Sequence, residues 1–304
     1  MPAHLPLSLS LHSFAKVNLY LKVLKKRSDN YHTIETIFER IGLCDQIILT
    51  CRTDRQIKIT CNSPQVPADN SNLCYKAAKL IQKKFNINNG LNIKIIKRIP
   101  VGAGLGGGSS NAATVLMGLS EFWGLSLSKE KLLTLSKTIG SDVPFFIHNC
   151  PFAEGRNRGD TVRPLNILKS VRLWHILVVP KIKVSTPLIY GKWDIALRSG
   201  KKHLGTLTKA RDDVKILTSV LRQNKPSLAA GMLFNDLESI TARLYPQVSY
   251  VRGKLMKVGV KSILMSGSGP AVFGICSSRK EAVSLSRKLK DQNRSWQVFV
   301  ARTH

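Results

Sequence analysis

The chain has 304 residues, 43% of them hydrophobic and 21% charged, which predicts a globular protein of two domains and excludes a disordered or low-complexity chain. The longest apolar run, about residues 175–179, is far shorter than the roughly 18 residues of a membrane span, so no membrane partner is expected. Lys and Arg number 47 against 18 Asp and Glu, a formal charge of +29, yet they are spread in twos and threes, which argues against a specific nucleic-acid partner.

Residues 8–24 alternate as a β-strand does, with Ala15 and Val17 on one face and Lys16 and Asn18 on the other. Side chains two residues apart on a strand point the same way, so Lys16 and Asn18 are expected to be neighbours. They lie either in a cleft or on a solvated edge, and this segment alone does not decide between the two.

A polar turn at 25–30 leads into Tyr31 and His32, which enter a second strand. Such residues at the start of a strand can stack on a planar ring or hydrogen-bond to it, although half-buried cover is the more common role. Further elements are predicted as strands at 45–52 and 56–62 and a helix at 72–85.

The segment 100–111 holds five glycines, at 102, 104, 106, 107 and 108, between a strand at 91–99 and an amphipathic helix. We expect that helix to begin at Ser109 or Ser110, either of which can cap it. Without side chains at the glycines, successive backbone N–H groups can wrap an anion, and the positive end of the helix dipole points to the same place. The segment is therefore interpreted as a phosphate-binding loop.

Two other readings of this loop are weaker. A flexible linker would not be bracketed by two well-formed elements. Residues 102–107 satisfy the dinucleotide pattern G-x-G-x-x-G, but a second strand should follow, whereas residues 110–140 predict two helices joined at 124–128. No Gly-Lys-Ser/Thr follows the glycines, which excludes the P-loop pattern.

Asp142 precedes the apolar run 143–147. It is either a helix N-cap, with Pro144 in the first turn, or a functional carboxylate, and the spacing alone favours the cap. A strand at 152–155 and a tight turn at 156–160 follow.

From about residue 160 the order of elements changes to that of an α+β domain with an antiparallel sheet. The elements are predicted as strands at 173–179, 262–265, 271–276 and 296–301, helices at 205–224, 228–242, 246–258 and 279–290, and a glycine turn at 266–270. We therefore expect two domains, 1–160 and 161–304.

The motifs Ala15–Asn18, the glycine loop ending at Ala113, and Ser266–Pro270 together resemble the GHMP small-molecule kinases. The residues around Asp142, with Tyr31–His32 and Phe152–Gly155, are similar to those of family members that phosphorylate a cytidine diphosphate-linked erythritol in the non-mevalonate route to isoprenoids. The resemblance runs from about residue 10 to 302, with no signature between 195 and 230. It implies a two-domain α+β fold, with an N-terminal ribosomal-protein-S5-domain-2-like domain and a C-terminal ferredoxin-like domain.

The resemblance also implies the site. Asp142 becomes the base that receives the substrate hydroxyl proton, which reverses the preference for a cap, and Lys16 stands beside it. Asn18 positions the substrate, and Tyr31 and His32 hold the cytosine. The residues expected to bind ATP are Pro100, Val101, Gly102, Ala103, Gly104, Leu105, Gly106, Gly107, Gly108, Ser109 and Ser110.

ATP is the implied co-substrate, with Mg²⁺ bridging its phosphates; the metal ligands are not identified, and Ser110 is only a candidate. Six cysteines without metal-binding spacing indicate free thiols in a reducing cytoplasm. The protein is expected to be a monomer or a homodimer. The turn 155–159 is more basic than the family leads one to expect, which leaves a phosphate contact open. Two alternatives remain: a sister kinase acting on mevalonate or homoserine, and a nucleic-acid-binding protein.

Overall fold

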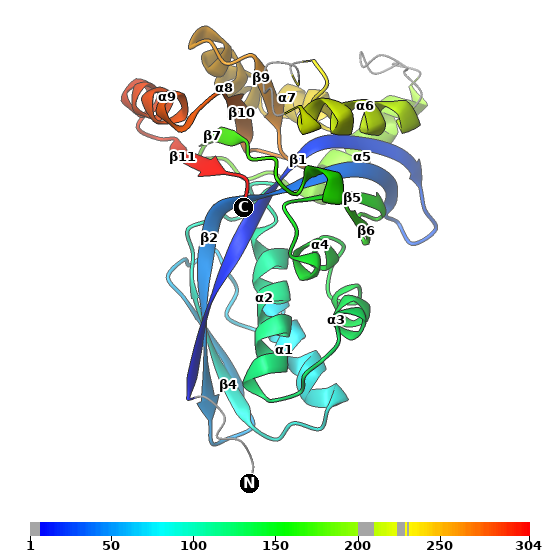
Figure 1. Ribbon diagram of the computed structural model, residues 1–304, viewed down its shortest axis with the longest axis vertical. Coiled ribbons are helices and arrows are strands. Elements are labelled where there is room, and N and C mark those ends of the chain that lie inside the picture. Colours follow the sequence, from blue (N-terminus) through cyan, green and yellow to red (C-terminus); the bar gives the residue numbers. More distant parts are fainter. Residues whose placement is uncertain (1–6, 200–209, 224–228, 230) are drawn as a thin grey trace.

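The computed structural model describes residues 7–199, 210–223, 229 and 231–304, and in this part of the chain two β-sheets are covered by helices (Figure 1). The larger sheet has the order β3-β4-β2-β1-β8, with β5 beside β2 and β6 beside β5. The smaller, antiparallel sheet has the order β11-β7-β10-β9. The α+β class predicted from the sequence is confirmed.

The strands of the larger sheet are β1 (Ser8–Lys26), β2 (His32–Arg52), β3 (Ile57–Cys61), β4 (Gly90–Ile96), β5 (Phe152–Asn157), β6 (Thr161–Pro164) and β8 (Phe234–Asn235). Those of the smaller sheet are β7 (Trp174–Val179), β9 (Ser262–Met265), β10 (Val272–Cys276) and β11 (Gln297–Arg302). The strands predicted at 56–62 and in the second half of the chain are confirmed, whereas β4 ends three residues before the predicted 99.

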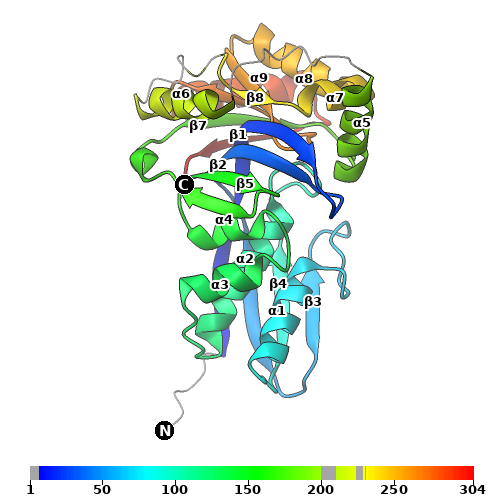
Figure 2. The same ribbon diagram turned by 90° about the vertical axis from the view of Figure 1, so that its right-hand side faces the viewer.

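Helices α1 (Leu73–Lys84) and α2 (Gly107–Phe122) cover one face of the larger sheet, as Figures 1 and 2 show, with α3 (Lys129–Ser136) and α4 (Val143–His148) beside them. The Asn72 side chain accepts a hydrogen bond from the Cys74 N–H at 2.8 Å and so caps α1. The Ser128 side chain does the same for α3, which confirms two helices joined at 124–128.

The other helices of the described residues are α5 (Thr186–Arg198), α6 (Ala210–Arg222), α7 (Glu238–Leu244), α8 (Pro246–Lys257) and α9 (Arg279–Gln292), and Asn166–Leu168 form the 3₁₀ turn η1. In Figure 2, α8 and α9 lie on the side of the smaller sheet that faces away from β1 and β2. The helices predicted at 246–258 and 279–290 are thus confirmed.

Strands β1 and β2 form a long antiparallel pair that runs from Ser8 opposite Thr50 to Lys26 opposite His32. The sequence predicts only the two ends of β2. Its middle is buried on both faces, as at Ile37 and Phe38, so the alternation of apolar and polar residues that marks a half-exposed strand is missing there.

One helix prediction needs correction, and one helix was not predicted. The helix that was not predicted is α5. Of the predicted helix 205–224, residues 210–222 are helical, and 205–209 and 224 lie outside the described residues. The predicted helix 228–242 is wrong over 231–237, where β8 pairs with β1 instead, and 228 and 230 lie outside the described part. Hydrogen bonds from the Asn235 side chain to the carbonyls of Met265 and Gly267, both 2.8 Å, compete with helix formation there.

The two sheets share a buried core. One cluster joins Leu19 and Ile41 of the larger sheet to Leu177 and Phe273 of the smaller one. The division into 1–160 and 161–304 therefore stays a prediction.

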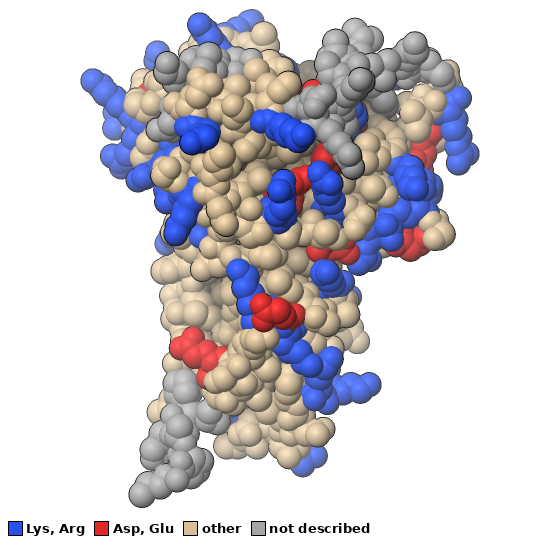
Figure 3. Space-filling view, turned by 45° about the vertical axis from the view of Figure 1, so that its right-hand side comes forward, with Lys and Arg blue, Asp and Glu red and all other residues tan. Residues whose placement is uncertain are grey.

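The surface in Figure 3 carries Lys and Arg in small groups over both parts of the molecule, with acidic side chains beside several of them. No basic groove stands out on that face. All six cysteines are unpaired, and no helix in the described residues is long and apolar enough to cross a membrane.

Candidate active site

A cleft of about 610 Å³ brings together most of the residues singled out in the sequence. Its wall includes Lys16 and Asn18 from β1, Tyr31 and His32 at the start of β2, and Asp142. The glycine segment contributes residues 102–109. Pro100, Val101 and Ser110 lie outside this wall.

The glycine loop alternates anchors with open positions. Ala103 and Leu105 are buried, and their carbonyls accept hydrogen bonds from the N–H groups of Ala271 (3.2 Å) and Lys16 (3.0 Å). Glycines 102, 104 and 106 all have positive φ, near +70°, and they alternate with the two buried residues Ala103 and Leu105. This alternation turns the anchoring carbonyls towards the protein, and it is the backbone pattern from which anion-binding nests are built.

Gly104 lies so close to the turn between β9 and β10 that an added Cβ would stand 2.1 Å from the Ser266 carbonyl oxygen. An added Cβ at Gly106 would stand 2.9 Å from Cγ of Lys16. Glycine at these two positions therefore lets the loop approach the second half of the chain and lets the lysine approach the loop.

Helix α2 begins at Gly107, so the predicted start at Ser109 or Ser110 is wrong. Gly106 occupies the N-cap without a side-chain bond. The Ser110 hydroxyl is buried and accepts from Ser13 at 2.7 Å, so it does not cap the helix. The Ser110 N–H already donates to the Gly106 carbonyl, whereas the N–H groups of residues 107–109 have no acceptor within the helix. Three amides at the positive end of the dipole thus face the loop.

Lys16 is buried, with its Nζ 2.6 Å from Asn18 Oδ1 and 3.7 Å from Asp142 Oδ2. The solvated-edge reading of β1 is therefore excluded. Burial lowers the pKa of Lys16 from the ordinary lysine value of 10.5, and the nearby Asp142 carboxylate partly opposes this shift. Asn18 in turn donates to Thr36 Oγ1 at 2.8 Å, which orients its carbonyl oxygen towards the lysine.

Asp142 stands at the N-cap position of α4 but makes no capping hydrogen bond. The cap expected from spacing alone is therefore not formed. Its side chain is 28% exposed and meets Lys16 on one side, and on the other Gly159, where an added Cβ would stand 3.8 Å from Asp142 Oδ1. A half-exposed carboxylate beside a buried cation can accept a proton from a bound hydroxyl group.

The far end of the cleft is lined by rings. The His32 ring stacks on Tyr190 of α5, with centroids 4.9 Å apart and planes 26° apart. Its Nε2 lies 2.6 Å from Asp194 Oδ1, and Lys26 Nζ lies 2.8 Å from Asp194 Oδ2. Tyr31 is 53% exposed, so its ring is open to a ligand.

Tyr190 and Asp194 were missed because α5 was missed. A local signal does exist: Ser185 accepts from the Leu188 N–H at the N-cap, and a proline occupies the first turn. Tyr190 and Asp194 are four residues apart on this helix and so share the face that meets His32.

A smaller cavity of about 180 Å³ adjoins the cleft, and Leu73, Gly102 and Gly108 line both. Its other walls are mostly apolar, with Val66, Ile95 and Val101 among them. Val101, which is not on the wall of the cleft, thus lines this smaller cavity. The sequence did not predict the cavity.

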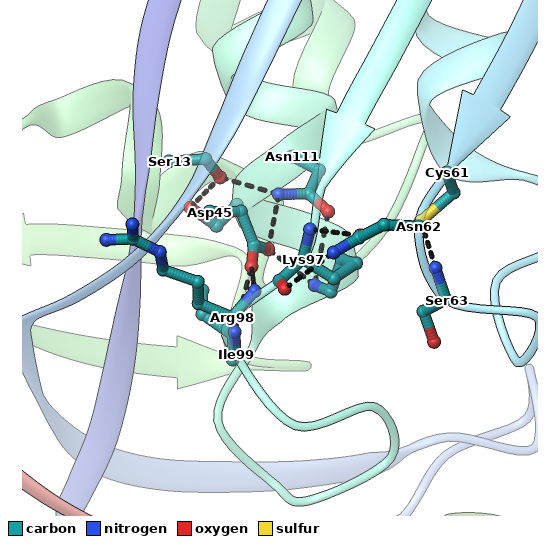
Figure 4. A network of polar contacts seen from close by, with 10 residues as sticks. Ser13, Asp45, Cys61, Asn62, Ser63, Lys97, Arg98, Ile99 and Asn111 are labelled. Atoms are coloured by element: carbon teal, nitrogen blue, oxygen red, sulfur yellow. Dashed lines mark hydrogen bonds and ion pairs between the residues drawn. The ribbon is translucent and has the colours of Figure 1, made fainter.

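Behind the loop, Asp45 makes a buried polar network (Figure 4). Its Oδ1 accepts from the N–H groups of Arg98 (2.7 Å) and Ile99 (2.9 Å), and its Oδ2 accepts from Asn111 Nδ2 (2.9 Å) and pairs with Lys97 Nζ. The strand end before the glycines and the helix after them are thus tied to one carboxylate.

The chain is similar to known proteins along most of its length. A family profile described as "GHMP kinases N terminal domain" matches residues 72–150, and "GHMP kinases C terminal" matches 216–295. A protein from Shouchella clausii (strain KSM-K16), named 4-diphosphocytidyl-2-C-methyl-D-erythritol kinase, is 41% identical over 88% of this chain and 85% of its own. One of the same name from Acetivibrio thermocellus is 35% identical over 97% and 99%.

Among solved structures, a crystal structure of 4-(cytidine 5'-diphospho)-2C-methyl-D-erythritol kinase superposes with a TM-score of 0.77. Its sequence is 30% identical, and the match covers 97% of this chain and 98% of that one.

Proposed function

Because this chain belongs to the GHMP kinase family, and within it to the 4-diphosphocytidyl-2-C-methyl-D-erythritol kinases, we propose that it transfers the γ-phosphoryl group of ATP to the 2-hydroxyl of 4-diphosphocytidyl-2-C-methyl-D-erythritol. The single observation that carries the proposal is the contact between Lys16 and Asp142, 3.7 Å apart beside the glycine loop. The six unpaired cysteines suit the cytoplasm as the place of this reaction.

The ATP phosphates are assigned to the loop amides and to the free N–H groups of residues 107–109. Backbone donors there act together with the helix dipole, so no loop lysine is needed. The adenine ring is assigned to the 180 Å³ cavity behind Gly102 and Gly108, whose apolar walls suit a flat ring.

Asp142 acts as the base in this proposal. The substrate hydroxyl oxygen attacks the γ-phosphorus, the bond to the β–γ bridging oxygen breaks, and Asp142 receives the hydroxyl proton. Lys16 lies beside the carboxylate and offsets the negative charge on the transferring group. Asn18 holds Lys16 in place and lies where it can also meet the substrate.

The cytosine is assigned to the ring-lined end. Tyr31 supplies an exposed face for stacking, and the His32 ring is held by Asp194 and Tyr190 so that its orientation is set before the substrate arrives. Mevalonate and homoserine have no ring to place there.

Mg²⁺ fits this site as an ion carried in by ATP. No group of three or more His, Cys, Asp or Glu suited to a metal occurs in the described residues, and Asp194 on the cleft wall is already paired with Lys26. Mg²⁺ commonly takes most of its ligands from phosphates and water. The Ser109 hydroxyl, on the cleft wall, is the protein oxygen we assign to it, because that of Ser110 is buried against Ser13. The ion would neutralise charge between the phosphates.

The proposal is tested by ADP release with ATP and each of three alcohols: the cytidylyl-methylerythritol substrate, mevalonate and homoserine. We expect turnover with the first alone. Comparable kcat/KM on either of the others would replace this proposal with the sister-kinase alternative. Binding to generic duplex DNA should be weak and should fall steeply with salt; tight binding at physiological salt would favour the nucleic-acid alternative.

A further inference from the structure

The turn between β5 and β6 carries a guanidinium group at the edge of the cleft. Arg158 lies on the cleft wall, and its guanidinium carbon is 5.2 Å from the centre of the Tyr31 ring. Asp160 Oδ2 accepts from Arg158 Nε at 3.0 Å and from Nη2 at 2.6 Å. One edge of the guanidinium is therefore fixed by the protein, while Nη1 has no hydrogen-bond partner among the residues described.

The position of this group along the cleft is set by its neighbour. Gly159 has φ +93°, and an added Cβ there would lie 3.3 Å from Ile34 and 3.8 Å from Asp142 Oδ1. Arg158 thus lies against the ring of Tyr31, and the next residue in the chain, Gly159, lies against the proposed base. In the proposed substrate, a diphosphate joins the methylerythritol, which meets Asp142, to the cytidine, which meets Tyr31. The diphosphate must therefore pass beside Arg158.

The other charged groups of the cleft wall named so far are either acidic or already paired. Asp142 is acidic, and Lys16 is engaged with it deeper in the cleft. Lys26, also on the cleft wall, is paired with Asp194. A diphosphate entering here needs a positive group with free donors, and a guanidinium presents two N–H groups in a planar fork that matches phosphate oxygens.

The other two arginines of the same hairpin, Arg156 and Arg163, form ion pairs away from the cleft wall. Arg156 and Arg163 both pair with Glu154, at 2.5 and 2.6 Å, and neither lies on the cleft wall. Of the three arginines of this hairpin, two therefore form structural ion pairs with Glu154, and the guanidinium of Arg158 lies on the cleft wall.

We propose that Arg158 binds the diphosphate of the cytidine-linked substrate through its free edge, while Asp160 and Tyr31 orient it. This inference rests on the proposed function. It assigns a substrate-binding residue and a determinant of preference for a nucleoside diphosphate over a nucleoside.

The experiment compares the affinities of CDP and cytidine for wild type, Arg158→Gln and the matched control Arg163→Gln by titration calorimetry. In Arg158→Gln we expect the Kd of CDP to rise about 10- to 100-fold, as the loss of a charged hydrogen bond predicts, with that of cytidine changed less than about twofold. In turnover assays KM for the cytidylyl substrate should rise while KM for ATP stays unchanged. Arg163→Gln should match wild type in all of these.

Equal losses of CDP and cytidine affinity in Arg158→Gln would overturn the inference, because Arg158 would then only support the Tyr31 ring. If the single variant fails to fold, the double variant Arg158→Gln/Asp160→Asn removes both charges of the pair. The test is then the same: whether the Kd of CDP rises more than the Kd of cytidine relative to wild type. Wild type that binds neither CDP nor cytidine would overturn the proposed function as well, so the two failures are distinguishable.

Discussion

Replacing Asp45 by asparagine should destabilise the glycine loop without changing a residue that lines the cleft. Asp45 is fully buried, and its two oxygens accept from the backbone of Arg98 and Ile99 and from Asn111, besides pairing with Lys97. Asparagine has the same shape, but its NH₂ group would face donors, and the buried ammonium of Lys97 would lose its counter-charge.

The size of the effect follows from this burial. Side-chain exposure is 0% for Asp45 and 7% for Lys97, so neither group can turn to water. Removing one partner of a buried pair costs about 3–5 kcal/mol, a large part of the roughly 5–15 kcal/mol that stabilises a typical domain. Because Asp45 holds both ends of the loop, KM for ATP should also rise, while KM for the alcohol substrate should change little.

Urea denaturation of Asp45→Asn, Lys97→Met and the double variant measures the coupling. The double variant should be less destabilised than the sum of the single ones by up to about 3 kcal/mol, since it leaves no unpaired charge. The reasoning is refuted if Asp45→Asn stays within about 1 kcal/mol of wild type and its KM for ATP is unchanged. In that case the network in Figure 4 does not support the loop.

Further expectations concern the cleft. Asp142→Ala should lower kcat by about 10²- to 10⁴-fold with little change in substrate KM, measured by ADP release; unchanged turnover would remove Asp142 from the mechanism. The pKa of Lys16 is lowered by burial, and its cationic fraction falls as pH rises through that pKa, so kcat/KM should decline on the alkaline side below pH 10.5; a pH profile flat to 10.5 would contradict this. Gly104→Ala should raise KM for ATP more than Gly102→Ala, because both have positive φ but only Gly104 would bring a Cβ against the Ser266 carbonyl; equal effects would assign the loss to φ alone.

Local periodicity was enough to predict part of the site. The two-residue repeat of β1 predicted Lys16 and Asn18 as neighbours, and their side chains are 2.6 Å apart. The five glycines predicted a backbone loop before a helix, and the structure confirms both, with the helix starting two or three residues earlier than predicted. Both inferences use contacts within a few residues, where chain geometry leaves little freedom.

Contacts between distant segments could not be predicted in this way. Asp194 is 162 residues from His32, and Asp45 is 66 from Asn111, so nothing in the spacing joins them. The middle of β2 was missed for a related reason, because burial on both faces removes the alternation that identifies a strand.

Asp142 shows why an acidic residue before an apolar helix is ambiguous. The preference for such a residue at an N-cap comes from the free N–H groups of the first turn, which every helix has. A base needs something that no local pattern contains, namely a cation that keeps the carboxylate ionised and an open face for the acceptor. Here β1 supplies the cation as Lys16, and the 28% exposure of Asp142 supplies the open face. Since the short helix α4 forms without a side-chain cap, the carboxylate remains free for the proton transfer that we propose. The role that we propose for Asp142 therefore depends on where β1 places Lys16, not on the residues next to Asp142 in the chain.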